Sequence, residues 1–116
     1  MPPQVMTAEV NGITLAYQEL GSGYPLVLIN GFASTMDMWN PPVLAAFAEQ
    51  FRIIIFDNRG TGYSSTSDDP FTISLFASDT LTLMDALGIT RAHLLGHSMG
   101  TCIAQELVLV HPERAD

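Results

Sequence analysis

The sequence predicts an α/β fold, a three-layer sandwich around a mostly parallel sheet with an antiparallel N-terminal hairpin. Three continuously apolar runs, at 25–29, 52–56 and 92–96, are typical of strands that are covered on both faces. Segments of helical character lie between these runs, and this order favours right-handed crossovers and parallel pairing. Because 47% of the 116 residues are apolar, a single domain over residues 1–116 can bury a core.

The first part of the chain is expected to form the hairpin. Two loosely alternating segments, 5–10 and 13–20, flank an Asn-Gly pair. Asn-Gly between such segments predicts a two-residue turn, because both residues tolerate a positive φ. After the first apolar run a helix is expected over 43–51, with two prolines suited to its first turn.

Loop and helix are expected to alternate after the second apolar run. Residues 57–70 are rich in Gly, Ser, Thr and Asp, which predicts a loop. A helix is expected over 74–87, with Ser74 as its N-cap and Gly88 as its stop. A last helix is expected over 101–110, directly after the third apolar run.

Charge and composition exclude several classes of protein. The net charge is −8 and the four basic residues are all arginine, which argues against nucleic acid and an anionic membrane as partners. No apolar run approaches the roughly 20 residues of a membrane span. The N-terminus shows no leader pattern, so we expect a cytoplasmic protein. The single cysteine, Cys102, excludes an internal disulfide and is expected to be a small buried residue.

The chemistry is predicted at a G-x-S-x-G pentapeptide made of Gly96, His97, Ser98, Met99 and Gly100. It follows an apolar strand and precedes a helix, which is the context of a nucleophile elbow. A serine on so sharp a turn has a strained backbone, and its neighbours must lack a Cβ where strand and helix crowd together. We therefore predict that Ser98 is the catalytic nucleophile, held at the positive end of a helix dipole.

Two further loops are expected beside Ser98, because the carboxyl ends of parallel strands form the site of an open sheet. One of them contains Gly31 and Phe32, and the other spans 57–62. If the serine attacks a carbonyl group, the developing oxyanion needs preorganised hydrogen-bond donors. The backbone N–H groups of Phe32 and Met99 are the predicted oxyanion hole, and Gly31 leaves room for the substrate.

These motifs resemble the α/β-hydrolase superfamily, specifically its cofactor-independent esterases and C–C hydrolases. The resemblance extends from about residue 5 to the last residue. It rests on the elbow, on an Asn-Gly-Phe sequence at 30–32 where the family usually has His-Gly, and on a D-x-R-G-x-G-x-S loop at 57–64. It implies a serine hydrolase without metal or other cofactor that acts on a small apolar ester-like substrate.

The resemblance also implies supporting roles. Site-shaping residues are expected at Asn30, Gly31, Gly96, His97, Gly100, Asp57 and Arg59. For Asp57 and Arg59 we expect structural contacts that shape the floor of the site, because nothing in the sequence places either beside the nucleophile. Thr101 stands where a second glycine is common, which predicts looser packing between strand and helix.

A base and an orienting acid are needed to activate the serine, and the resemblance implies that both follow Ser98 in the chain. His93 lies roughly 16 Å away if a strand rises about 3.3 Å per residue. His111 lies roughly 20 Å away if a helix rises about 1.5 Å per residue. His97 is adjacent, but neighbouring side chains of an extended segment point to opposite faces. We therefore predict that this chain alone lacks the acid and the base of a triad.

Three hypotheses stay open at this point. The chain corresponds to the first five strands of a partial hydrolase fold, and the free edge of the strand at 92–96 invites another chain. In the first hypothesis a complementing C-terminal half pairs with that edge. In the second the chain is a non-catalytic homodimer completed by mutual burial of the edges, or, in a rarer form, a dimer with a triad in trans. In the third it is a weak esterase that uses only Ser98 and the two N–H donors.

Overall fold

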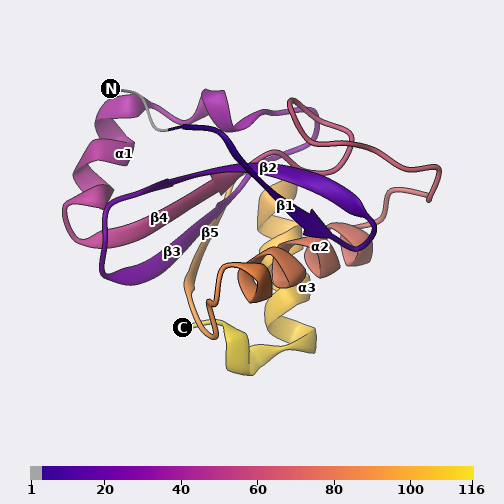
Figure 1. The fold of residues 1–116 in the computed structure, drawn as a ribbon. Coiled ribbons are helices and arrows are strands. Elements are labelled where there is room, and N and C mark those ends of the chain that lie inside the picture. Colours follow the sequence, from indigo (N-terminus) through magenta and orange to yellow (C-terminus); the bar gives the residue numbers. More distant parts are fainter. Residues whose placement is uncertain (1–3) are drawn as a thin grey trace.

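The computed structural model describes residues 4–116, whose five strands form one mixed sheet in the order β1-β2-β4-β3-β5 (Figure 1). The strands are β1 (Met6–Val10), β2 (Ile13–Leu20), β3 (Tyr24–Ile29), β4 (Phe51–Phe56) and β5 (His93–Gly96). The helices are α1 (Pro41–Ala48), α2 (Ile73–Ala86) and α3 (Met99–Val110), with short 3₁₀ turns at Met36–Met38 and Pro112–Arg114. The predicted α/β class is confirmed.

The N-terminal hairpin forms at the predicted Asn-Gly turn. Val10 of β1 pairs with Ile13 of β2. Asn11 (φ 51°) and Gly12 (φ 79°) supply the two positive φ angles that this tight turn requires. The side chain of Asn11 also anchors the turn to α2, because its Nδ2 donates a hydrogen bond to Asp79 Oδ1 at 2.9 Å. β2 then pairs antiparallel with β4, which joins the hairpin to the parallel strands.

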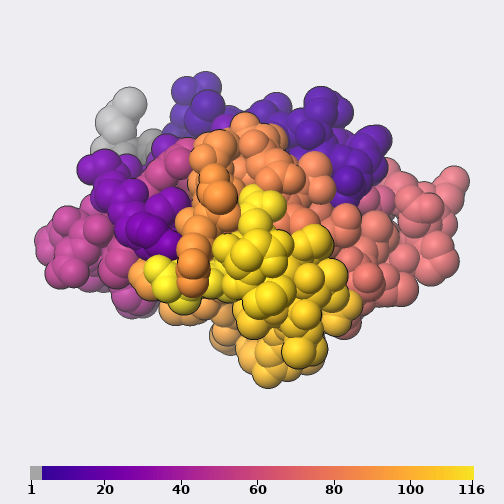
Figure 2. All heavy atoms as spheres, turned by 90° about the horizontal axis from the view of Figure 1, so that it is seen from below, coloured from indigo at the N-terminus to yellow at the C-terminus, as the bar shows by residue number. Residues whose placement is uncertain are grey.

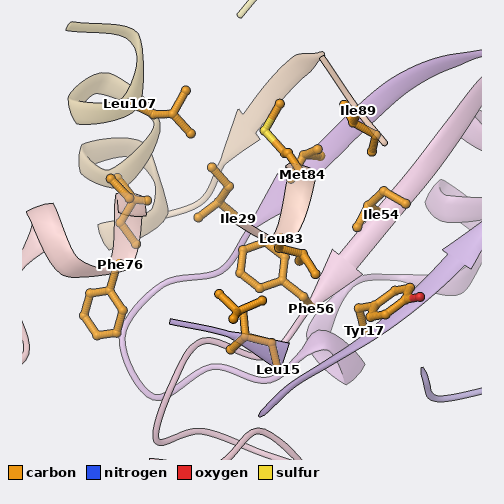
Figure 3. Close-up of a cluster of buried hydrophobic side chains, with 14 of the residues drawn as sticks. Leu15, Tyr17, Ile29, Ile54, Phe56, Phe76, Leu83, Met84, Ile89 and Leu107 are labelled. Atoms are coloured by element: carbon orange, nitrogen blue, oxygen red, sulfur yellow. The ribbon is translucent and has the colours of Figure 1, made fainter. Parts of the chain in front are cut away.

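Two apolar clusters on opposite faces of the sheet make the three layers. Alternate side chains of a strand point to opposite faces, so Ile29 and Phe56 pack toward α2 and α3 while Leu28 and Ile55 pack toward α1. Figure 3 shows the larger cluster, in which Leu107 of α3 lies among side chains of the sheet and of α2. The three-layer arrangement predicted from the apolar runs is confirmed.

The parallel register brings three loops to one edge of the sheet. Leu28 of β3 pairs with Ile55 of β4 and with Leu95 of β5, so the three strands end at nearly the same level. Each strand is followed by a loop or turn at its carboxyl end. This geometry places the loop after β3, the loop after β4 and the turn after β5 beside one another, as open parallel sheets generally do.

Several local predictions need correction. α1 begins at Pro41 and ends at Ala48, because the prolines themselves form its first turn. The N-cap of α2 is Thr72, not Ser74: Thr72 Oγ1 accepts the Leu75 N–H at 3.0 Å. Cys102 is exposed and not buried, because α3 turns other residues toward the sheet. The prediction that no leader is present falls partly on residues 1–3, which lie outside the described residues.

The outer edge of β5 is partly covered, where the sequence predicted it open. Ala92 forms a parallel bridge with Ala115. Its N–H donates to Arg114 O and its carbonyl accepts the Asp116 N–H, both at 3.0 Å. Beyond this bridge no strand of residues 4–116 pairs with the outer edge of β5. None of the helices in that part of the chain has the length and apolar character to cross a membrane.

A buried ion pair ties the loop after β4 to α2. Arg59 donates from Nε and Nη2 to the two carboxylate oxygens of Asp79, each at 2.8 Å, and both side chains are 1% exposed. The hydrogen bonds that Arg59 donates to Asp79 raise the pKa of Arg59 above its ordinary value, although burial acts in the opposite direction. Removing one member of such a pair leaves the other charge buried without a partner.

We therefore expect Asp79→Ala to lower the free energy of unfolding by about 3–5 kcal/mol, measured by urea denaturation. The matched control is Arg91→Ala, which breaks the Arg91–Asp116 ion pair, whose side chains are 53% and 49% exposed. That change should leave the free energy of unfolding within the error of the measurement, because solvent screens exposed pairs. Equal effects of the two substitutions would contradict the structural role assigned to Asp79.

Candidate active site

The backbone bends abruptly at Ser98, between β5 and α3. Ser98 has φ 57° and ψ −122°, a conformation that costs a residue other than glycine about 1–3 kcal/mol. On one side of the bend His97 N–H donates to Ile29 O at 3.0 Å. On the other side Gly100 N–H donates to His97 O and Thr101 N–H to Ser98 O, each at 2.9 Å. The helix therefore begins immediately after the serine, as a nucleophile elbow requires.

Three glycines make the bend sterically possible. A Cβ on Gly100 would overlap the carbonyl oxygen of Ile29, and one on Gly96 would overlap the carbonyl oxygen of Gly100. A Cβ on Gly31 would lie 2.9 Å from Ser98 Cβ. The backbones of β3, β5 and α3 thus touch one another around the serine, and each contact needs a residue without a side chain.

Two backbone N–H groups without an acceptor among the described residues belong to Met99, which follows Ser98, and to Phe32, which follows Gly31 at its contact with Ser98. Met99 is the first residue of α3, where N–H groups have no intrahelical acceptor and the helix dipole is positive. Phe32 follows Gly31 in the loop after β3, and its side chain is 74% exposed. Neither N–H group finds a hydrogen-bond acceptor within residues 4–116. The arrangement can receive an oxygen that gains negative charge beside Ser98.

The loop after β3 is fixed by a buried carboxylate and two buried amides. Asp57 Oδ1 accepts the Met36 N–H at 2.7 Å and Oδ2 accepts the Tyr63 N–H at 2.9 Å. Asn30 Nδ2 donates to Phe56 O at 3.1 Å, and Asn58 Nδ2 donates to Asn30 O at 3.3 Å. Asp57 is fully buried and both of its oxygens are engaged. It therefore positions the two loops and has no free oxygen for an acid–base step.

The histidines lie in other surroundings than the serine hydroxyl. His97 packs edge-on against Trp39, with 6.3 Å between ring centroids. His93 packs against Tyr24 and lies with Nδ1 3.0 Å from Asp116 O. His111 Nδ1 lies 3.3 Å from Glu113 Oε1. Within the described part of the chain no side chain forms a hydrogen bond with Ser98 Oγ.

A hollow of about 380 Å³ opens between the loop after β3 and the loop after β4. It is lined by Gly31, Phe32, Ala33, Thr35, Asn58, Arg59, Gly60, Thr61, Gly62, Phe71, Phe76 and Met99. These lining residues include Phe32 and Met99, whose N–H groups have no acceptor in the described chain, so the hollow adjoins the predicted oxyanion hole. Residues 4–116 contain no group of three or more His, Cys, Asp or Glu side chains placed to hold a metal ion.

Comparison with known proteins agrees with this geometry. A family model described as alpha/beta hydrolase fold matches residues 24–116. The chain belongs to the α/β-hydrolase fold family. This confirms the superfamily resemblance inferred from the sequence motifs.

Relatives in this family are considerably longer than the chain. It is 42% identical over 102 residues to a putative non-heme bromoperoxidase of Mycobacterium tuberculosis, covering 87% of this chain and 38% of that protein. It is 39% identical over 92 residues to a putative carbamate hydrolase of Caulobacter, covering 78% of this chain and 34% of that protein. The chain therefore spans between a third and two fifths of the length of these curated relatives.

Solved structures of the family superpose closely. A hydrolase from Pseudomonas aeruginosa matches with a TM-score of 0.92 and 35% identity, over 97% of this chain and 43% of that one. An enol-lactonase from Burkholderia xenovorans matches with a TM-score of 0.91 and 36% identity, over 96% and 44%. The chain thus corresponds to less than half of each of these two solved structures.

Two features of the site had no counterpart in the sequence analysis. Asp79, the partner of Arg59, is buried between Phe76 and Leu83 in the apolar stripe of α2, and a lone carboxylate in such a stripe is the signal that could have identified it. Phe71 lines the hollow from the loop before α2, where no periodic pattern marks a side chain as part of a site. The roles of the elbow residues themselves stay predictions.

The glycine contacts give a direct test of the elbow. We expect Gly100→Ala to lower the free energy of unfolding by about 2–3 kcal/mol, because the added methyl group overlaps the Ile29 carbonyl. The loss should occur although alanine is the better helix former by about 1 kcal/mol. The exposed Cys102→Ala in the same helix is the control and should change little. Stabilisation by Gly100→Ala would show that α3 does not approach β3 so closely.

Proposed function

We propose that this chain is the nucleophile-bearing part of a serine hydrolase that cleaves ester or related acyl or C–C bonds. The observation that carries the proposal is the strained Ser98, which lies at the sharp bend between β5 and α3 and against Gly31 of the loop after β3. Related proteins are described as hydrolases of several kinds, among them a putative carbamate hydrolase and an enol-lactonase. Their range supports a reaction class and not one substrate.

The reaction begins with attack by the serine hydroxyl. Ser98 Oγ bonds to the carbonyl carbon, the carbonyl electron pair moves to oxygen, and the Phe32 and Met99 N–H groups stabilise that oxyanion. A base takes the serine proton and passes it to the leaving group as the intermediate collapses to an acyl-enzyme. Water then hydrolyses the acyl-enzyme by the reverse sequence of proton transfers. No cofactor enters these steps.

The base and its acid are proposed to come from polypeptide outside these 116 residues. Ser98 Oγ has no hydrogen-bond partner in residues 4–116, and the histidines pack against other groups. The family order places acid and base after the nucleophile. More than half of the length of these curated relatives lies outside the part that this chain matches.

The edge of β5 is the proposed docking place for that polypeptide. The parallel bridge between Ala92 and Ala115 already occupies one end of the edge, so a strand added there would run parallel to β5. Beside the edge lies an open groove of about 540 Å³, lined in part by Leu94, Ala104 and Val108. Figure 2 views the side of the molecule on which α3 and the C-terminal residues lie at the surface.

Complementation tests this proposal. Mixing the chain with the part of the Mycobacterium tuberculosis relative that follows the aligned segment should raise p-nitrophenyl acetate hydrolysis by about 10²-fold or more, the usual contribution of general acid–base catalysis. Ser98→Ala should abolish the gain, while the exposed Cys102→Ala should keep it. If the mixture is no faster than the separate chains, or if Ser98→Ala is equally active, the proposal is wrong.

A non-catalytic homodimer is the second candidate, and one observation favours it. The last turn of α3 exposes three apolar side chains, Val108 (41%), Leu109 (78%) and Val110 (59%), and exposed apolar surface often marks an interface. If two β5 strands were related by a two-fold axis perpendicular to the sheet, their edges would pair antiparallel. Such pairing needs the full edge of each short strand, and Ala115 already pairs with Ala92 at one end of it. A homodimer would therefore pack through α3.

The homodimer candidate predicts that the chain sediments as a dimer at micromolar concentration and that Leu109→Asp dissociates it, because the new carboxylate would be buried at the interface. Cys102→Ser, an exposed change elsewhere on α3, should leave the dimer intact. Sedimentation velocity over a range of concentrations provides the measurement. A monomer at every concentration would exclude this candidate.

A further inference from the structure

The hollow beside the predicted oxyanion hole has the properties of a substrate subsite. Its volume of about 380 Å³ falls within the range of small-molecule pockets. It shares Gly31, Phe32 and Met99 with the site, and it lies toward α2, away from the open edge of β5. A substrate whose carbonyl oxygen contacts the two N–H groups would therefore direct one of its substituents into the hollow.

Three aromatic side chains form part of the walls of the hollow, beside smaller and polar residues. Phe76 is 4% exposed and anchored in the core, and Phe71 packs against it with 5.6 Å between ring centroids. Phe71 also lies on the backbone of Gly60, where an added Cβ would come within 2.8 Å of its ring. Phe71 itself is 45% exposed and Phe32 74% exposed. Two aromatic side chains thus border the opening, while a fixed one forms the interior wall.

The hollow carries no available charge, although Arg59 lines it. The two donors Nε and Nη2 are engaged by Asp79, and Nη1 donates to Ser67 Oγ at 2.6 Å and contacts Asp69 at 3.4 Å. The guanidinium is 1% exposed. No lining residue is a carboxylate. A charged substituent would lose water here without gaining a partner of opposite charge, so the hollow selects against carboxylates and ammonium groups.

We propose that this hollow binds the substituent on the substrate's carbonyl carbon and selects uncharged, ring-sized apolar groups, with Phe71 as the specificity-determining side chain. The substrates of the site are then neutral aromatic or cyclic aliphatic carbonyl compounds. The inference rests on the proposed function, because the hollow is a substrate subsite only if Ser98 attacks the carbonyl group of a bound substrate. Binding in the hollow, however, needs no base and no turnover, so it can be measured separately.

The test uses the ¹⁵N-labelled chain carrying Ser98→Ala, titrated with methyl benzoate and with its 4-carboxylate derivative, monomethyl terephthalate, and followed by amide chemical shifts. Methyl benzoate should shift the amides of Phe32, Gly60 and Met99, and monomethyl terephthalate should bind at least about tenfold more weakly because the charge on its ring is desolvated in the hollow. Phe71→Ala should weaken methyl benzoate binding by about five- to tenfold, in keeping with the loss of one aromatic contact. Phe71→Leu should retain most of the affinity.

Leu109→Ala, in the exposed face of α3, is the matched control and should leave binding unchanged. The amide spectrum of each variant reports whether it is folded. If the Phe71→Ala variant does not fold, the Phe71→Leu variant still tests the role of Phe71. Equal binding of monomethyl terephthalate and methyl benzoate, no binding of either, shifts confined to the α3 groove, or full affinity in a folded Phe71→Ala variant would each overturn the inference. Failed complementation combined with the expected shifts would reject the proposed function and keep the subsite.

Discussion

The close approach of the first turn of α3 to the end of β3 is the constraint on which the candidate site depends. Gly100 rests against the carbonyl of Ile29, and Gly96 against the carbonyl of Gly100. At this separation the chain has to reverse direction within one residue, and Ser98 takes the positive φ that results. The same contact sets where α3 begins, with Met99 as its first residue, so the strain at Ser98 and the role that we propose for Met99 depend on one contact.

The surrounding loops are held by buried polar groups in addition to apolar packing, to which Met36 contributes in the loop after β3. Asp57 binds the backbone of both loops, and Arg59 joins the second loop to α2 through Asp79. The hydrogen bonds that Arg59 donates to Asp79 and Ser67 fix the loop. They also leave the hollow next to the predicted oxyanion hole without an unpaired charge. A single ion pair therefore holds the loop against α2 and, in the subsite that we propose, leaves no free charge for a substituent of the substrate.

Sequence patterns predicted those parts of the molecule whose causes are local. The Asn-Gly turn, the apolar strands and the G-x-S-x-G turn follow from the conformations that these residues allow. The pairing of Arg59 with Asp79 joins residues that are 20 positions apart, and no local pattern reveals it. The cap at Thr72 was missed because threonine and serine two residues apart are both competent caps. The bridge to Ala115 was missed because a two-residue segment has no strand pattern.

The central claim is that Ser98 becomes a nucleophile only when a base from outside these 116 residues reaches it. Intact-mass spectrometry with a p-nitrophenyl phosphonate ester tests this most directly, because attack by a serine hydroxyl on phosphorus expels p-nitrophenolate and leaves a stable adduct. The account predicts one adduct per chain, mapped to Ser98, after complementation and none for the chain alone. An adduct on another residue, or equal labelling of Ser98 without the complementing polypeptide, would contradict it.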